Sequence, residues 1–164
     1  MKKYIIIILA IFSLTTGCSK FLDEQPQGPY PTSAFYKTES HALLAINACY
    51  ESLSFANSSN RLWVVTDVVS NDAVKGGFPG DQADIEQIDN FQIFESNGNL
   101  ESIWSIYYEG ISRCNRVLKY VPDIDMDKAL RDRIIGEAYF IRGYLYFQLG
   151  NIFGNIPLIL EPLA

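Results

Sequence analysis

Basic residues are scarce in this sequence, which holds 13 Lys and Arg against 19 Asp and Glu and has a formal net charge of −6. A nucleic-acid-binding face must neutralise several phosphates, so this balance argues against nucleic acid as a partner. Histidine occurs once, at His41, and the three cysteines, at positions 18, 49 and 114, follow no zinc-binding spacing. We therefore expect no metal site, and three cysteines are too few for a disulfide-rich scaffold.

Charged residues reach only 20% of the 164 residues, whereas hydrophobic residues make up 48% and aromatic residues 13%. This composition excludes wholesale disorder and is typical of a folded domain with an apolar core. The glycine-rich stretch 76–80 lacks the Lys-Ser/Thr ending of a phosphate-binding loop, and no cofactor is expected. Cys49 and Cys114 fall on apolar faces of expected helices, where a buried thiol is more common than a disulfide or a catalytic pair.

A membrane-spanning run is missing at the amino terminus, where the apolar residues 4–14 provide about half of the roughly 20 residues that cross a bilayer as a helix. Two lysines precede this run, as in an export signal. The run ends in Leu14-Thr15-Thr16-Gly17-Cys18, which resembles the bacterial lipobox, where a thiol is acylated and the peptide bond before it is cut. We predict a lipoprotein signal peptide over residues 1–17 and a lipid anchor on Cys18. A plain signal peptide and an uncleaved anchor are the alternatives.

Residues 18–37 contain proline, glycine and glutamine too densely for a helix or a strand, and they predict a tether that leads into the fold. The body of the protein is then a helical domain over residues 38–164. Apolar residues recur at three- and four-residue steps from Ala42 to Leu53, so we expect a first helix at about 39–54.

The next stretch is harder to interpret. Residues 62–69 are apolar and rich in β-branched side chains, and they could form either a buried strand or a short helix. The segment from Ser70 to Asn99 has weak periodicity and several glycines, which predicts mainly a long loop. Loops of this length in compact domains are usually functional.

Two longer helices are predicted after this loop. The first begins near Leu100, is capped by Asn99 and stops at Pro122, and the second opens near Asp125 or Asp127. The second helix, which runs to about position 149, is apolar on nearly every side, so we expect it to be buried among other helices. The short connection predicts an antiparallel hairpin and an all-α fold. One apolar stripe of the second helix consists of Ala138, Ile141, Leu145 and Leu149, and the other of Phe140, Tyr144 and Phe147.

Both helices contain longer sequence patterns. Residues 104–118, WSIYYEGISRCNRVL, match the pattern W-x-x-x-Y-x-x-I-x-x-x-N-x-x-L. Residues 136–149, GEAYFIRGYLYFQL, resemble G-E-A-x-F-x-R-A-x-x-Y-F-x-L, with Gly143 where alanine is usual, and residues 154–158, GNIPL, resemble the ending G-D-x-P-L. These patterns resemble those of the SusD/RagB family, and the cysteine-led start after the signal also resembles that of the family. The resemblance therefore runs along the whole sequence.

This resemblance implies tetratricopeptide-like helical hairpins with long loops, in an outer-membrane lipoprotein that is exposed on the cell surface. Such a protein sits over a SusC-type TonB-dependent transporter and captures oligosaccharides for import, and it is not an enzyme. Because family members are several hundred residues long, the sequence would correspond to the amino-terminal part of such a protein.

The resemblance also implies structural roles for five residues. Trp104 and Tyr107 are expected to fill the core between the helices. Asn115, Glu137 and Arg142 lie among apolar neighbours and must find polar partners. We expect a buried network that joins Glu137 to Arg142 or to Asn115.

The long loop is the best candidate for ligand contact. Sugar rings present apolar C–H faces and hydroxyl rims, so a binding site needs an exposed aromatic platform with amides or carboxylates beside it. The loop has both, because Phe78 lies in a Gly/Pro turn with polar side chains close in sequence. We expect Trp63 in the core, and Phe91 and Phe94 packed beneath the loop. The predicted ligand-binding residues are Asn71, Asp72, Phe78 and Asp81.

Two other classes of protein compete with glycan capture. A glycoside hydrolase needs two positioned carboxylates, and the acidic stretch 81–89 allows so many pairings that it gives no specific signal. A helical scaffold lipoprotein that docks to an envelope partner without binding glycan is the main alternative. Polysaccharide binding by the mature chain distinguishes the two.

Overall fold

The computed structural model describes residues 32–54 and 60–163 of the chain. The chain divides into two units, residues 1–35 and residues 36–164. The first unit contributes one described element, the single-turn helix α2 (Thr32–Phe35). All the other described elements belong to the second unit.

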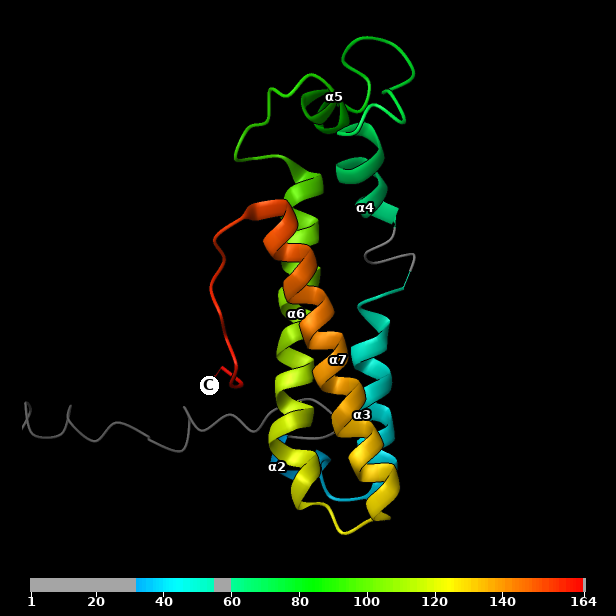
Figure 1. Ribbon diagram of the computed structural model, residues 1–164, viewed down its shortest axis with the longest axis vertical. Coiled ribbons are helices and arrows are strands. Elements are labelled where there is room, and N and C mark those ends of the chain that lie inside the picture. Colours follow the sequence, from blue (N-terminus) through cyan, green and yellow to red (C-terminus); the bar gives the residue numbers. More distant parts are fainter. Residues whose placement is uncertain (1–31, 55–59, 164) are drawn as a thin grey trace, which may run out of the picture. The chain divides into compact units, whose positions relative to one another are not determined.

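Three helices form the main bundle of the second unit: α3 (Glu39–Glu51), α6 (Gly98–Tyr120) and α7 (Lys128–Phe153). Helices α6 and α7 run antiparallel and are joined through the short helix η4 (Val121–Asp123), and α3 packs against both (Figure 1). The described residues form no strand. The predicted all-α fold and the hairpin across the Pro-Asp turn are therefore confirmed.

Side chains at the start of each long helix accept its first amide hydrogen bonds. Thr38 and Asp127 do so for α3 and α7. In α6 the cap is Asn97 rather than the predicted Asn99, because Asn97 Oδ1 accepts hydrogen bonds from the N–H groups of Asn99 and Leu100. The helix consequently begins at Gly98, two residues earlier than predicted.

The core of the bundle is built from one apolar stripe on each helix. On α7 the stripe is fully buried, and removal of each Leu or Ile side chain from water contributes about 1.5–3 kcal/mol. Its partners on α6 include Tyr107, Ile111 and Val117, which are equally withdrawn from solvent. The buried residues of α7 are Ile134, Ala138, Ile141, Leu145 and Leu149.

The second apolar stripe of α7 lies at the surface. Phe140 and Phe147 are 71% and 64% exposed, because α3 and α6 both pack against the side of α7 that carries Leu145. The prediction that this helix is buried on every side is therefore wrong for the described residues. The helix also continues past its predicted end, to Phe153, and stops where Gly154 adopts a φ of +75°.

A smaller group of elements, here called the cap, comprises residues 60–97 and lies beyond the amino-terminal end of α6 (Figure 1). Its own core consists of Val64, Val68 and Ile88, with Ile85 packed against them. The elements of the cap are α4 (Asn60–Trp63), the π-helical turn η3 (Val64–Val68) and α5 (Ala83–Asp89).

The cap settles one open interpretation and corrects another. Residues 62–68 are helical, since α4 continues directly into η3, and Val69 follows in a turn. The long loop predicted between Ser70 and Asn99 contains α5, which its weak periodicity did not reveal. Seven residues give only two turns of helix, and only Ile88 of α5 is fully buried, so the apolar signal is short.

The carboxyl-terminal segment (residues 154–163) runs back along α6, as Figure 1 shows. Tyrosine hydroxyls hold its backbone: Tyr108 donates to the carbonyl of Pro157 at 2.7 Å, and Tyr146 donates to the carbonyl of Ile159 at 2.7 Å. These bonds satisfy carbonyl groups of a segment that has no secondary structure of its own. The segment is thereby fixed against the hairpin.

A polar pair between α6 and α7 holds the same segment. Arg142 Nη1 donates to Asn115 Oδ1 at 2.7 Å, and Asn115 Nδ2 donates to the carbonyl of Ile159 at 2.9 Å. Glu137 lies outside this pair and forms an ion pair with Arg133 at 3.2 Å. The expected link from Glu137 to Arg142 or Asn115 is therefore not formed, because a partner one turn earlier on the exposed side of α7 takes the carboxylate.

Candidate functional site

The cap contains a hollow of about 350 Å³ between the end of α4, the loop that follows η3 and the start of α5. Trp63 stands on one side, and the loop that joins η3 to α5 supplies most of the remaining wall. The residues that line this cap hollow are Trp63, Val74, Lys75, Gly76, Gly77, Asp81, Gln82 and Ile85.

Short hydrogen bonds hold the loop around the hollow. Lys75 Nζ donates to the carbonyl of Phe78 at 2.7 Å, and the N–H of Gly80 donates to Glu86 Oε2 at 3.0 Å. Gly77 has a φ of +85°, and a Cβ at this position would lie 2.7 Å from the carboxylate Oδ2 of the Asp81 side chain. The loop therefore needs glycine at this position, both for its backbone angle and for the close approach of the carboxylate.

The lining of the cap hollow combines an aromatic ring with polar side chains. Trp63 is 41% exposed rather than part of the core as predicted, so its ring is available to a ligand. The Asp81 carboxylate and the Gln82 amide line the same hollow, together with the Lys75 side chain. An exposed indole beside an acceptor carboxylate and an amide is the arrangement that a sugar ring requires.

The structure separates the four residues predicted to contact ligand. Asp81 lines the cap hollow, whereas Phe78 projects from the same loop and is 83% exposed. Asn71 and Asp72 lie in the turn after η3 and do not line the hollow, and Asp72 Oδ2 accepts a hydrogen bond from Ser70 at 3.0 Å. The hollow thus brings Asp81 together with Trp63, a residue predicted to lie in the core.

Phe91 and Phe94, which were expected to pack beneath the loop, are instead exposed to solvent. They lie in the connection between α5 and α6, where Phe91 has a left-handed φ of +54°. The cap core is filled by the valines of η3 and by Ile88, so it leaves no place for these two rings.

A second set of hydrogen bonds ties the cap to α6. Asn97 is fully buried, and its Nδ2 donates to the carbonyl of Asp84 at 2.8 Å and to Gln87 Oε1 at 3.0 Å. Arg61 Nη1 donates to Asn99 Oδ1 at 2.9 Å. One asparagine therefore caps α6 and fastens α5 to it, which positions the cap hollow on the bundle. The Asn-Gly-Asn sequence signalled a turn but not these tertiary contacts.

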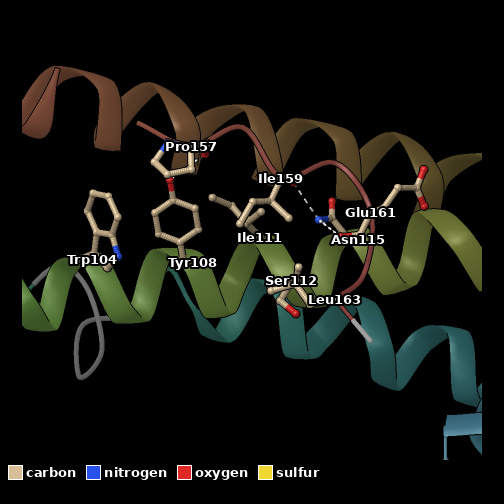
Figure 2. Close-up of a pocket in the computed structure, with 9 residues that line it drawn as sticks. All are labelled: Trp104, Tyr108, Ile111, Ser112, Asn115, Pro157, Ile159, Glu161 and Leu163. Carbon is tan, nitrogen blue, oxygen red and sulfur yellow. Dashed lines mark hydrogen bonds between the residues drawn. The ribbon is translucent and has the colours of Figure 1, made fainter. Parts of the chain in front are cut away.

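A second hollow, of about 220 Å³, lies between α6 and the carboxyl-terminal segment. Figure 2 shows Trp104, Tyr108 and Ile111 reaching from α6 toward Pro157 and Ile159 of this segment. Its walls are mostly apolar, and burial raises the pKa of Tyr108, whose hydroxyl donates to Pro157.

Trp104, which was expected to fill the core between the helices, lies at its edge and also lines this second hollow. It is half-buried and packs edge-on against Phe153 of α7, with ring centroids 5.1 Å apart. Its neighbour Tyr107 is fully buried between the helices. Adjacent helical residues point about 100° apart, and the tyrosine of the quoted motif falls on Tyr108, so the motif describes the side of α6 that faces the carboxyl-terminal segment.

Comparison with known proteins places the chain in a family. Residues 20–164 match the family described as starch-binding and associating with the outer membrane. SusD-like protein P2 of Formosa agariphila is 30% identical over 97% of the chain, and a SusD-like protein of Bacteroides ovatus is 26% identical over 97%. The chain spans 31% and 29% of the lengths of these two relatives.

Two solved structures share the helical arrangement. A laminarin-binding SusD-like protein superposes with a TM-score of 0.71 and 35% identity over 79% of this chain and 28% of its own. Surface glycan-binding protein A from Bacteroides fluxus superposes with a TM-score of 0.68 and 32% identity over 77% of this chain and 28% of its own. The shared fold is the tetratricopeptide-like helical fold. The chain therefore belongs to the SusD/RagB family.

Proposed function

We propose that this chain is the amino-terminal helical region of a cell-surface glycan-binding protein and that the cap hollow contacts the glycan. The half-exposed Trp63 ring beside Asp81 and Gln82 is the observation that carries this proposal. The family description, which is starch-binding, and the laminarin-binding and glycan-binding relatives support the same class of ligand.

The chemistry of the hollow favours binding over hydrolysis. A glycosidase places two carboxyl groups on either side of the bond that it cleaves. Among the described residues that line the cap hollow, Asp81 is the only carboxylate. An indole face can stack on the C–H face of a sugar while Asp81 and Gln82 accept and donate hydrogen bonds at its hydroxyls. We therefore propose a binding protein rather than an enzyme.

Replacing Trp63 by alanine should weaken glycan retention about tenfold, because the stacking surface is lost while the cap core of valines and Ile88 stays intact. Phe78→Ala should weaken retention less, since Phe78 stands outside the lining of the hollow. Affinity electrophoresis in gels that contain laminarin or starch measures retention, and circular dichroism checks that the helices remain.

Phe91→Ala is the matched control, since it removes an exposed aromatic ring of the cap that does not line the hollow. It should bind as the wild type does. Equal losses of retention for Trp63→Ala and Phe91→Ala would mean that glycan binds non-specifically to exposed aromatic rings of the cap. Unchanged retention in Trp63→Ala would mean that the cap hollow does not contact glycan.

We also propose that the protein is anchored in the outer membrane through an acylated Cys18 and works with a SusC-type TonB-dependent transporter. Cys18 and the signal peptide proposed for residues 1–17 lie outside the described residues, as does most of the tether proposed for residues 18–37. The family's description as associating with the outer membrane supports this location. Within the described residues, no helix is long and apolar enough to cross a membrane.

Cys18→Ala should release the protein from the membrane fraction, because the residue after the signal peptide then has no thiol to be acylated. The wild type should incorporate labelled palmitate and co-purify with a TonB-dependent barrel. A Cys18→Ala protein that stays with membranes, together with an unlabelled wild type, would contradict the anchor. Absence of any barrel from the purified wild type would contradict the transporter partnership.

A docking role without glycan binding is the second candidate function. The exposed aromatic rings of α7, Phe140 and Phe147, favour a protein contact because large apolar groups at a surface often mark an interface. Co-purification of a barrel without retention by any polysaccharide would favour this role. Retention that depends on Trp63 would favour glycan capture.

A further inference from the structure

The two buried cysteines of the bundle stand on facing helices. Cys49 lies near the carboxyl end of α3 and Cys114 in α6, and both are free thiols with no exposed surface. Cys49 Sγ donates to the carbonyl of Ala45 at 3.4 Å, and the two thiols are near enough for each to shift the pKa of the other. A buried cysteine often serves only as a small apolar side chain. Cys49 and Cys114 come from distant parts of the sequence and are neighbours in the fold, which allows a second role as a pair.

The register of α3 against α6 puts the two cysteines beside a close contact of these helices. The helices run antiparallel, since Tyr36 stacks on Tyr120 with ring centroids 5.0 Å apart and Arg113 Nη1 donates to the carbonyl of Ala48 at 2.9 Å. The chain approaches α6 closely at Gly110, where a Cβ would lie 2.8 Å from the Cβ of Ser52.

Cys49 and Cys114 occupy the turn next to this close approach. Cys49 is three residues before Ser52, and Cys114 is four residues after Gly110, so each lies one helical turn away on the same side. The antiparallel register therefore places the two cysteines at facing positions of α3 and α6. A disulfide needs such facing positions, with Cβ atoms about 3.5–4.5 Å apart.

The surroundings of the two thiols make them unequal. The neighbouring Cys49 thiol, aided by the guanidinium groups of Arg142 and Arg113, lowers the pKa of Cys114. The neighbouring Cys114 thiol and burial raise the pKa of Cys49. In the folded protein the two sulfur atoms therefore share one electrostatic environment.

We propose that Cys49 and Cys114 form a disulfide that joins α3 to α6 when the protein folds under oxidising conditions. The oxidant is a dithiol oxidoreductase in its disulfide form, or glutathione disulfide. One cysteine attacks this disulfide and forms a mixed disulfide, and the second cysteine then attacks the first and displaces the oxidant. Two electrons pass to the oxidant, which leaves as two thiols carrying the two protons. Oxidation occurs during folding, before α3 and α6 enclose both sulfur atoms.

The bond would tie together the two helices between which the cap is inserted. The cap begins after α3 and ends at α6, so the ring closed by the disulfide contains all the residues of the cap hollow. Closing a long loop stabilises the fold mainly by restricting the unfolded chain. The disulfide would thus keep α3 and α6, the two helices that flank the cap in the sequence, from separating.

Thiol trapping tests the proposal. The protein is refolded in a glutathione buffer poised as in oxidising compartments, quenched with acid, denatured, labelled with N-ethylmaleimide and digested with trypsin. Cleavage after Lys37, Arg61, Arg113 and Arg116 places the two cysteines on separate peptides, 38–61 and 114–116. We expect these peptides joined and unlabelled. Label on both cysteines as complete as after reduction, or linkage to Cys18 or to a second molecule, overturns the proposal.

Thermal unfolding gives an independent readout. Reductant should lower the Tm of the wild type by about 5–15 °C. It should leave the Tm of a Cys49→Ala variant unchanged, and this variant should carry label on Cys114. If reductant lowered the Tm of both proteins equally, no disulfide would join Cys49 to Cys114. Neither readout depends on glycan, so failure here and failure of glycan retention are separate results.

Discussion

Replacing Leu145 by alanine should lower the free energy of unfolding by about 2–5 kcal/mol, because it removes buried methyl groups and leaves a cavity. Leu145 is fully buried on α7, and its Cδ1 lies 2.7 Å from where a Cβ on Gly110 of α6 would stand. The side chain therefore fills the contact between the two helices of the hairpin. Denaturant unfolding followed by the helical circular dichroism signal measures the loss.

Phe147→Ala is the control on the same helix. Phe147 belongs to the exposed stripe of α7, so its truncation should change stability by less than about 0.5 kcal/mol. The pair separates burial from apolar character, because both residues are large and apolar and only one is packed. Similar losses for the two variants would mean that the exposed stripe is covered in solution, and an unaltered midpoint for Leu145→Ala would contradict the core assignment.

The hairpin was predictable from the sequence because its signal is long and regular. The apolar residues of α6 and α7 recur at helical spacing over many turns, and Pro122 marks the connection. Periodicity shows which sides of a helix are apolar but not which elements cover them. The aromatic stripe around Phe140 has the same pattern as the buried stripe around Leu145, and only the packing of α3 and α6 distinguishes the two.

The cap was less predictable because its structure depends on contacts between residues distant in sequence. The residue before α5 is Gln82, which has a left-handed φ of +48° and gives no side-chain cap, so the usual sequence signal for a helix start is missing. The start of α6 depends on Asn97, whose partners Asp84 and Gln87 belong to α5. No local pattern contains this tertiary arrangement.

The position of Trp63 depends on packing that its residue type does not reveal. A tryptophan in an apolar stretch is more often a core residue than an exposed one, which is why Trp63 was expected in the core. In the observed helix, Val64 and Val68 are four residues apart and point into the cap core, which leaves Trp63 half-exposed at the hollow. The candidate glycan contact therefore follows from helical rather than extended geometry.

Gly110→Ala should destabilise the protein by about 2 kcal/mol, although alanine is the better helix former. A Cβ at Gly110 would lie within 2.8 Å of Ser52 Oγ, Ser52 Cβ and Leu145 Cδ1. The hydroxyl and the leucine methyl can rotate away, but the Ser52 Cβ is fixed to the backbone, so α3 must move from α6. Such overpacking costs about 3 kcal/mol, which exceeds the roughly 1 kcal/mol gained in helix propensity.

Gly143→Ala provides the matched control, since nothing lies within 4 Å of a Cβ built at Gly143 on the exposed side of α7. This change should raise stability by up to about 1 kcal/mol. The two substitutions are chemically identical and both lie inside long helices. Opposite changes in the free energy of unfolding would therefore report the difference in the space available to the added Cβ.

A double-mutant cycle identifies the obstacle. Ser52→Gly removes the Cβ and the hydroxyl that an alanine at position 110 would meet, so Gly110→Ala should cost less in that background than in the wild type. The remaining cost then belongs to Leu145, whose terminal methyl can adopt another rotamer. If Gly110→Ala were equally destabilising in both backgrounds, the close approach of α3 to α6 would be wrong, and with it the geometry that brings Cys49 to Cys114.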